Sequence, residues 1–133
     1  MNPLYPMVAS RAGNRCEYCR APEAVFNFPF EVEHITPTSL GGADVESNLA
    51  LACRACNLRK SNHLRGTDAQ SGEEVRLFHP REDAWKEHFS ADAETGEIVG
   101  ITSIGRATVV LLEMNSDVQR AARRHWIRLG LFP

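Results

Sequence analysis

The sequence predicts a single α+β domain, with short strands in its first half and helices closing the second. Three observations support this class. Polar and apolar residues alternate over residues 30–35, an apolar run follows at 48–53, and a capping-box pattern opens a helical segment at residue 116. A length of 133 residues suits one domain, and 43% hydrophobic with 24% charged residues is typical of a globular protein.

The segment from residue 30 to residue 63 predicts the order strand, long loop, strand, helix. FEVEHI alternates as a strand does, and Pro37 ends it. The following TSLGGADVESN is rich in turn-forming residues, and NLALAC resumes an apolar run that can pair back as a second strand. CNLRKSNHL then begins a helix. The loop would return His34 close to the start of that helix.

Outside this segment we predict a short N-terminal helix, a hairpin and two closing helices. PLYPMVASRAGNRC can form a helix that ends near Gly13. Residues 84–103 flank AETGE with two short segments, which is the pattern of a hairpin. GRATVVLLEMN is apolar enough for a buried helix, and Ser116 opens a capped helix that runs to Gly130.

The four cysteines occur as two CxxC pairs, Cys16–Cys19 and Cys53–Cys56, and none is left over. Two such turns from distant parts of a chain suit a tetrahedral Zn²⁺ site, which would be closed, structural and able to contribute folding energy. Two disulfides would need an oxidising compartment. A redox pair would need a βαβ context, whereas an iron site with four cysteines uses the same ligands. We favour zinc over these three alternatives.

Charge is distributed unevenly, although the net charge is only −2. Residues 51–66 carry four basic residues and no acidic one, whereas residues 67–100 are strongly acidic. A set of arginines on the last predicted helix falls at mostly i, i+3 and i+4 spacing and forms one basic stripe: Arg120, Arg123, Arg124 and Arg128. These stretches either bind phosphates or are solvated helix faces that balance the acidic segment.

The N-terminal stretch and the hydropathy argue against a secreted or membrane protein. No apolar run approaches the ~20 residues that a membrane span needs. The first residues, MNPLYPMVASRAGNR, lack a basic stretch followed by an apolar core. We therefore expect a cytoplasmic protein with no membrane partner.

Residues 16–63 resemble the HNH endonucleases, in the subgroup where two CxxC pairs hold a zinc ion. The resemblance rests on residues that agree in type, order and spacing: Glu33-His34, Gly41-Gly42, Asn48-Leu49, Cys53-x-x-Cys56-Asn57 and Lys60. It implies a ββα-metal core over residues 1–66. Residues 67–133 would form an α/β extension packed on that core, and they resemble the C-terminal part of stand-alone bacterial HNH proteins.

The resemblance assigns a role to each matching position. His34 would be the general base that activates water, because an imidazole can accept a proton near neutral pH. Glu33 and Asn57 would bind a catalytic divalent cation, and their oxygen ligands suit Mg²⁺ or Mn²⁺. Asn48 would hold the loop and the strands in register, so that His34 is aimed correctly.

Three further residues have weaker assignments. His63 lies six residues after Asn57, about one and a half helical turns on, and would be either a metal ligand or a helix-end residue. The place where some family members carry another metal-binding histidine is Ser61 here. Arg59 and Lys60 would either face phosphates or belong to a solvated helix face.

The sequence therefore predicts a metal-dependent endonuclease that hydrolyses phosphodiester bonds, with DNA as the expected substrate. The alternative is a zinc-stabilised nucleic-acid-binding module on the same scaffold without hydrolytic activity. A zinc protein-interaction domain is a third reading, which the basic stretches disfavour. A dimer would be a simple route to cutting both strands.

Overall fold

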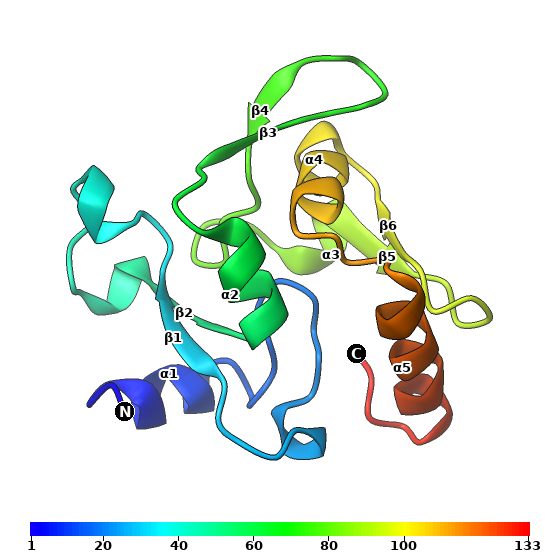
Figure 1. Cartoon of the computed structure of the whole chain (residues 1–133), viewed down its shortest axis with the longest axis horizontal. Coiled ribbons are helices and arrows are strands. Elements are labelled where there is room, and N and C mark those ends of the chain that lie inside the picture. Colours follow the sequence, from blue (N-terminus) through cyan, green and yellow to red (C-terminus); the bar gives the residue numbers. More distant parts are fainter.

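A two-stranded hairpin and one helix form the centre of the first half of the chain. The computed structural model describes all 133 residues. Strands β1 (Glu31–His34) and β2 (Leu49–Ala52) pair antiparallel, with His34 opposite Leu49, and helix α2 (Arg54–Lys60) follows at once. Figure 1 shows α2 beside this hairpin. The predicted order strand, loop, strand, helix is confirmed.

Helix α1 (Tyr5–Arg11) covers the hairpin near its second strand. Its residues Val8 and Ala9 are buried, and all four residues of β2 are buried as well. The Arg11 guanidinium donates hydrogen bonds to the carbonyl oxygens of Glu46 and Leu49, at 2.9 and 2.6 Å. The N-terminal helix predicted from the sequence is therefore present, and it also fixes the entry into β2.

The long loop between β1 and β2 contains two 3₁₀ turns, Thr38–Leu40 and Glu46–Asn48. Gly41 adopts a φ of +89°, which glycine reaches without steric cost. A Cβ atom on Gly42 would lie 1.8 Å from the carbonyl oxygen of Thr36. The loop therefore needs glycine at both positions, one for its conformation and the other for a close approach of two backbone segments.

The second half of the chain contains two more hairpins and three helices. They are β3 (Arg65–Thr67), β4 (Glu74–Arg76), α3 (Trp85–His88), β5 (Phe89–Ala91), β6 (Ile98–Gly100), α4 (Ser103–Leu111) and α5 (Asp117–Arg128). The predicted hairpin corresponds to β5–β6, and the two closing helices to α4 and α5. The hairpin β3–β4 was not predicted.

One hydrophobic cluster runs through both halves, from Val8 under the first hairpin to Met114 after α4. Trp85 lies at the junction, where its indole N–H donates to the Tyr18 carbonyl oxygen at 2.8 Å. The basic stripe expected on α5 is not continuous. Arg123 is buried and donates to the carbonyl oxygens of Gly96 and Met114 at 2.6 and 2.9 Å. No helix has the length and apolar character that crossing a membrane requires.

Candidate metal centre and active site

The four cysteines converge on one point, although the two pairs lie far apart in the sequence. All four are buried, and their sulfur atoms lie within 4.8 Å of one another. The Sγ atoms of Cys19 and Cys53 are 3.8 Å apart. A zinc ion with four Zn–S bonds of ~2.3 Å has tetrahedral S···S edges of about 3.8 Å. The donor set and the spacing therefore fit a structural zinc ion.

Each CxxC pair is held in place by local hydrogen bonds. Glu17, inside the first pair, bonds β2 twice: its backbone N–H donates to the Leu51 carbonyl, and its carboxylate accepts from the Leu51 N–H at 2.8 Å. In the second pair Cys53 is the N-cap of α2, where its sulfur accepts from the Cys56 N–H at 3.5 Å. Hydrogen bonds from the other thiols, with Cys16 the largest contributor, lower the pKa of Cys53 and favour a thiolate ligand.

Helix α5 supplies a buried cation beside the cysteines. Burial lowers the pKa of Arg123, and the nearby sulfurs of Cys19, Cys53 and Cys56 oppose that shift. Zinc with four thiolates carries a net charge of about −2, so a guanidinium close to the cluster would partly balance it. This role could not be predicted from the sequence, because a buried arginine cannot be distinguished from a surface one by its spacing on a helix.

Glu33 points from β1 toward α2 and is buried, in contact with Lys60 and Tyr18. The Lys60 ammonium lies 2.5 Å from Oε1 and the Tyr18 hydroxyl donates to Oε2 at 2.7 Å. Apart from this close ion pair with Lys60, Oε1 has no polar partner. Burial raises the pKa of Glu33, and Lys60 and Tyr18 reduce that rise.

Asn57 lies on the same side of α2 as Lys60, about one turn before it. Its amide nitrogen donates to the carboxylate of Glu31, the residue two positions before Glu33 on the same face of β1. Glu31 also accepts from Arg54 at 2.9 Å. The structure thus places Asn57 nearest to Glu31, a half-buried carboxylate that sequence reasoning did not single out.

His34 ends β1 and is half-buried, with 26% of its side chain exposed. Its Nε2 atom lies 3.1 Å from a carboxylate oxygen of Asp44, in the loop that follows. Because a carboxylate only accepts, this contact places the imidazole proton on Nε2 and leaves Nδ1 as the acceptor. Asp44 was not predicted as a site residue, although its position in the Gly41-Gly42 loop was the available signal.

Asn48 connects the two ends of this loop with its side-chain amide. Oδ1 accepts from the Thr36 N–H at 2.8 Å, while Nδ2 donates to the carbonyl oxygens of Thr36 and Ala43 at 3.0 and 2.9 Å. The Ile35 N–H donates to the Asn48 carbonyl oxygen at 2.9 Å. Asn48 therefore fixes the backbone directly after His34.

The remaining predicted residues occupy different environments. Lys60 is only 2% exposed and its ammonium also donates to the Ile35 carbonyl at 2.7 Å, so it does not reach a phosphate at the surface. Arg59 extends toward the end of α4, where it pairs with Glu113 at 3.4 Å. His63 is exposed, in the turn after α2.

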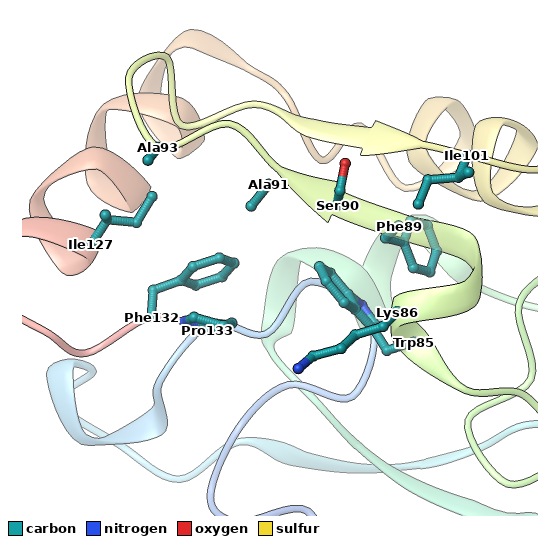
Figure 2. Close-up of a pocket in the computed structure, with 10 residues that line it drawn as sticks. All are labelled: Trp85, Lys86, Phe89, Ser90, Ala91, Ala93, Ile101, Ile127, Phe132 and Pro133. Carbon is teal, nitrogen blue, oxygen red and sulfur yellow. The ribbon is translucent and has the colours of Figure 1, made fainter.

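A cavity of about 420 Å³ is lined by residues far from these in the sequence (Figure 2). Figure 2 shows Trp85, Phe89 and Phe132 facing it, with Lys86 the one titratable side chain in its lining. None of the residues that carry the HNH resemblance lines it. The cavity is therefore not part of the candidate active site.

Comparison with known families gives a match within the first half of the chain. Residues 16–63 match the family model described as HNH endonuclease, which confirms the resemblance seen in the sequence. Neither the curated proteins nor the solved structures include a match to this chain. The matched residues contain both cysteine pairs, β1, β2 and α2.

Proposed function

With an HNH segment at residues 16–63 as the premise, we propose that this protein is a divalent-cation-dependent endonuclease that hydrolyses phosphodiester bonds in DNA. The observation that carries the proposal is the geometry of His34. The ring is accessible, Asp44 orients it through Nε2, and the bonds of Asn48 fix the backbone that follows. An imidazole held in this way is a suitable general base.

In the proposed reaction Nδ1 of His34 takes a proton from the water that attacks phosphorus. Asp44 stabilises the imidazolium that forms, because its carboxylate accepts a hydrogen bond from the Nε2–H group. The bond from phosphorus to the 3′ oxygen breaks, and that oxygen takes a proton from a second water molecule. The products are a 5′-phosphate and a 3′-hydroxyl, as the resemblance implies. Asn48 takes no part in proton transfer and acts by positioning.

Glu33 and Asn57 would hold the catalytic cation. Oε1 of Glu33 is buried and has the Lys60 ammonium, 2.5 Å away, as its one polar partner, and the oxygen of the Asn57 amide is not used by the bond that its nitrogen makes. Both oxygens suit a hard cation such as Mg²⁺ or Mn²⁺. A divalent cation bound there would neutralise charge that develops on the phosphoryl oxygens.

One observation favours the alternative of a non-catalytic nucleic-acid-binding module. The Glu33 carboxylate already has a cationic partner in Lys60 and a donor in Tyr18. If that ion pair satisfied Glu33 fully, the residue would be structural and no cation would bind. The two proposals differ in whether added Mg²⁺ or Mn²⁺ has an effect.

The test is plasmid cleavage by the zinc-loaded full chain with Mg²⁺, with Mn²⁺ and without added divalent cation. We expect the wild type to convert supercoiled DNA to nicked or linear DNA only with the cation, and His34→Ala to lose this activity with its fold and zinc content intact. His125→Ala, at an exposed histidine on α5, is the control that should retain it. Cleavage by His34→Ala at the wild-type rate would refute the proposed base.

A further inference from the structure

A small pocket beside the candidate active site joins the HNH segment to the rest of the chain. We propose that it binds a phosphodiester group of the DNA strand next to the group that is cleaved, with His63 and His79 as the donors. The proposal rests on the proposed function in taking DNA as the substrate. It also gives the segment after residue 63 a role in binding, which the sequence did not reveal.

The lining of this pocket has basic and neutral side chains but no acidic ones. It comprises Ile35 and Thr36 after β1, Lys60 at the end of α2, His63 and Leu64, and residues 76–79, which begin at the last residue of β4. Its volume is about 170 Å³. Because small-molecule sites usually occupy about 300–1,000 Å³, this space suits a phosphate group better than a whole nucleotide.

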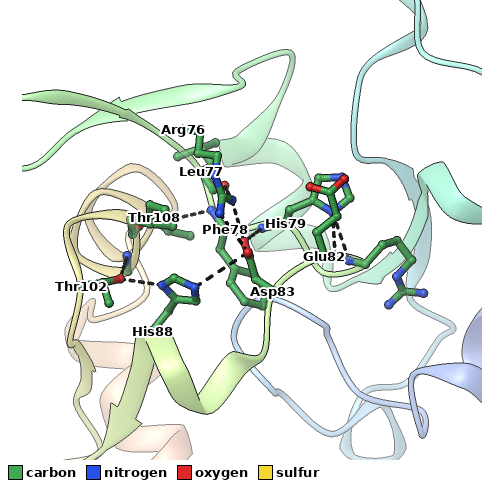
Figure 3. A network of polar contacts seen from close by, with 12 residues as sticks. Arg76, Leu77, Phe78, His79, Glu82, Asp83, His88, Thr102 and Thr108 are labelled. Carbon is green, nitrogen blue, oxygen red and sulfur yellow. Dashed lines mark hydrogen bonds and ion pairs between the residues drawn. The ribbon is translucent and has the colours of Figure 1, made fainter.

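His79 is held in one orientation with a free donor. Its Nδ1 accepts the backbone N–H groups of Arg81 and Glu82, both at 3.2 Å. Figure 3 shows these contacts, with His79 on the opposite side of the 76–83 segment from His88. In the neutral ring the proton is therefore on Nε2, which makes no hydrogen bond within the chain and can donate to a phosphate oxygen.

The other polar groups complete the pocket. The ring of His63 makes no hydrogen bond within the chain and is exposed, so it can turn toward a ligand. Arg76 is bound through both terminal nitrogens to Asp83, at 2.7 and 2.9 Å, which fixes the segment that carries His79. Lys60 is neutralised by Glu33. The two imidazoles therefore keep unused donors, and the Thr36 hydroxyl makes no hydrogen bond within the chain either.

The chain itself places the pocket close to His34. Thr36 is two residues further on, and two residues span at most about 7 Å. Successive nucleotides of a DNA strand advance about 3.4 Å along the helix axis. A strand with one phosphate at His34 would therefore have a neighbouring phosphate within reach of the pocket. The backbone of Thr36 is fixed, because the Asn48 side chain makes hydrogen bonds with its N–H group and its carbonyl oxygen.

The experiment measures binding of a fluorescein-labelled duplex by anisotropy, without added divalent cation, over a series of salt concentrations. In His79→Asn the Asn oxygen can still accept the two backbone N–H groups, but the Nε2 donor is gone. We expect about tenfold weaker binding. His63→Arg should bind more tightly and steepen the plot of log K against log salt by about 0.9, the value for one added phosphate contact.

His125→Arg is the matched control, because it adds the same charge at an exposed histidine of α5, outside the pocket. The proposal is overturned if His79→Asn binds like the wild type, or if the two arginine variants gain affinity equally. A chain that cleaves DNA while its pocket variants bind normally would refute only this inference. If the wild type does not cleave DNA but the variants show the expected changes in binding, only the proposed nuclease activity is refuted.

Discussion

Replacing Lys60 with Met removes one half of the buried ion pair that joins α2 to β1. The Lys60 and Glu33 side chains are 2% and 4% exposed, and their charged atoms are 2.5 Å apart. Lys60 also donates a hydrogen bond to the carbonyl oxygen of Ile35, the residue that follows the last paired residue of β1. Met fills a similar volume but leaves Glu33 with Tyr18 as its one remaining polar partner.

The magnitude follows from the burial of the charge that is left behind. Removing one partner of a buried pair costs about 3–5 kcal/mol, a large part of the 5–15 kcal/mol that stabilises a typical domain. Glu33→Gln should also destabilise, because it leaves the Lys60 ammonium buried without a counter-charge. In the double variant neither charge remains, so it should be more stable than the sum of the single effects predicts, by about 2–3 kcal/mol.

Urea unfolding of the zinc-loaded proteins, followed by circular dichroism, gives the four free energies of this cycle. Arg54→Met is the matched control on the same helix, because Arg54 pairs with Glu31 at 2.9 Å but is 62% exposed. Such a surface pair should contribute at most about 1 kcal/mol. Two results would show that the buried pair does not stabilise the contact of α2 with β1. One is a loss of unfolding free energy in Lys60→Met no larger than in Arg54→Met, and the other is simple additivity of the Lys60→Met and Glu33→Gln losses.

Three further variants test other parts of the structure. Cys53→Ser should lose zinc and solubility together, as metal analysis and sedimentation of the lysate would show; a folded, zinc-free variant would contradict the structural role of the metal. Gly42→Ala should disturb the loop at Thr36 and lower the thermal midpoint, because the added Cβ would meet the Thr36 carbonyl oxygen at 1.8 Å. Ser116→Ala removes the oxygen that accepts from the Gln119 N–H at the start of α5 and should cost about 1 kcal/mol in urea unfolding. An unchanged thermal midpoint for Gly42→Ala would argue against the close approach at Thr36. An unchanged urea midpoint for Ser116→Ala would argue against the cap of α5.

The parts predicted correctly from the sequence are those whose physical requirements are local. Two CxxC turns from distant parts of a chain suit one tetrahedral metal site, and the cysteines meet at one point as expected. The alternation at 30–35 and the Ser116 cap predicted β1 and α5 because each pattern is set by neighbours along the chain. The hairpin β3–β4 was not predicted, since its strands of three residues are too short to show the alternation of polar and apolar residues.

Residues whose environment is set by distant segments could not be predicted in the same way. Lys60 and Arg123 have the sequence context of exposed helix residues, yet both are buried against groups from other elements. Lys60 faces β1, and Arg123 reaches carbonyl oxygens after β5 and α4. The contact of Asp44 with His34 depends on how a long loop folds back. Composition and spacing state how many charges a helix carries, but tertiary packing decides which of them face water.

Tyr18 shows why the zinc site, the reaction site and the extension cannot be treated as independent parts. It lies between Cys16 and Cys19, its hydroxyl donates to Glu33 at 2.7 Å, and its carbonyl oxygen accepts from the Trp85 indole at 2.8 Å. Burial, with Glu33 as the next contribution, raises the pKa of this hydroxyl and keeps it protonated as a donor. Displacement of the metal would free the turn that carries Tyr18, and both contacts would then loosen together. The zinc site therefore influences the candidate cation ligand Glu33 through a single side chain, although it has no open position for chemistry of its own.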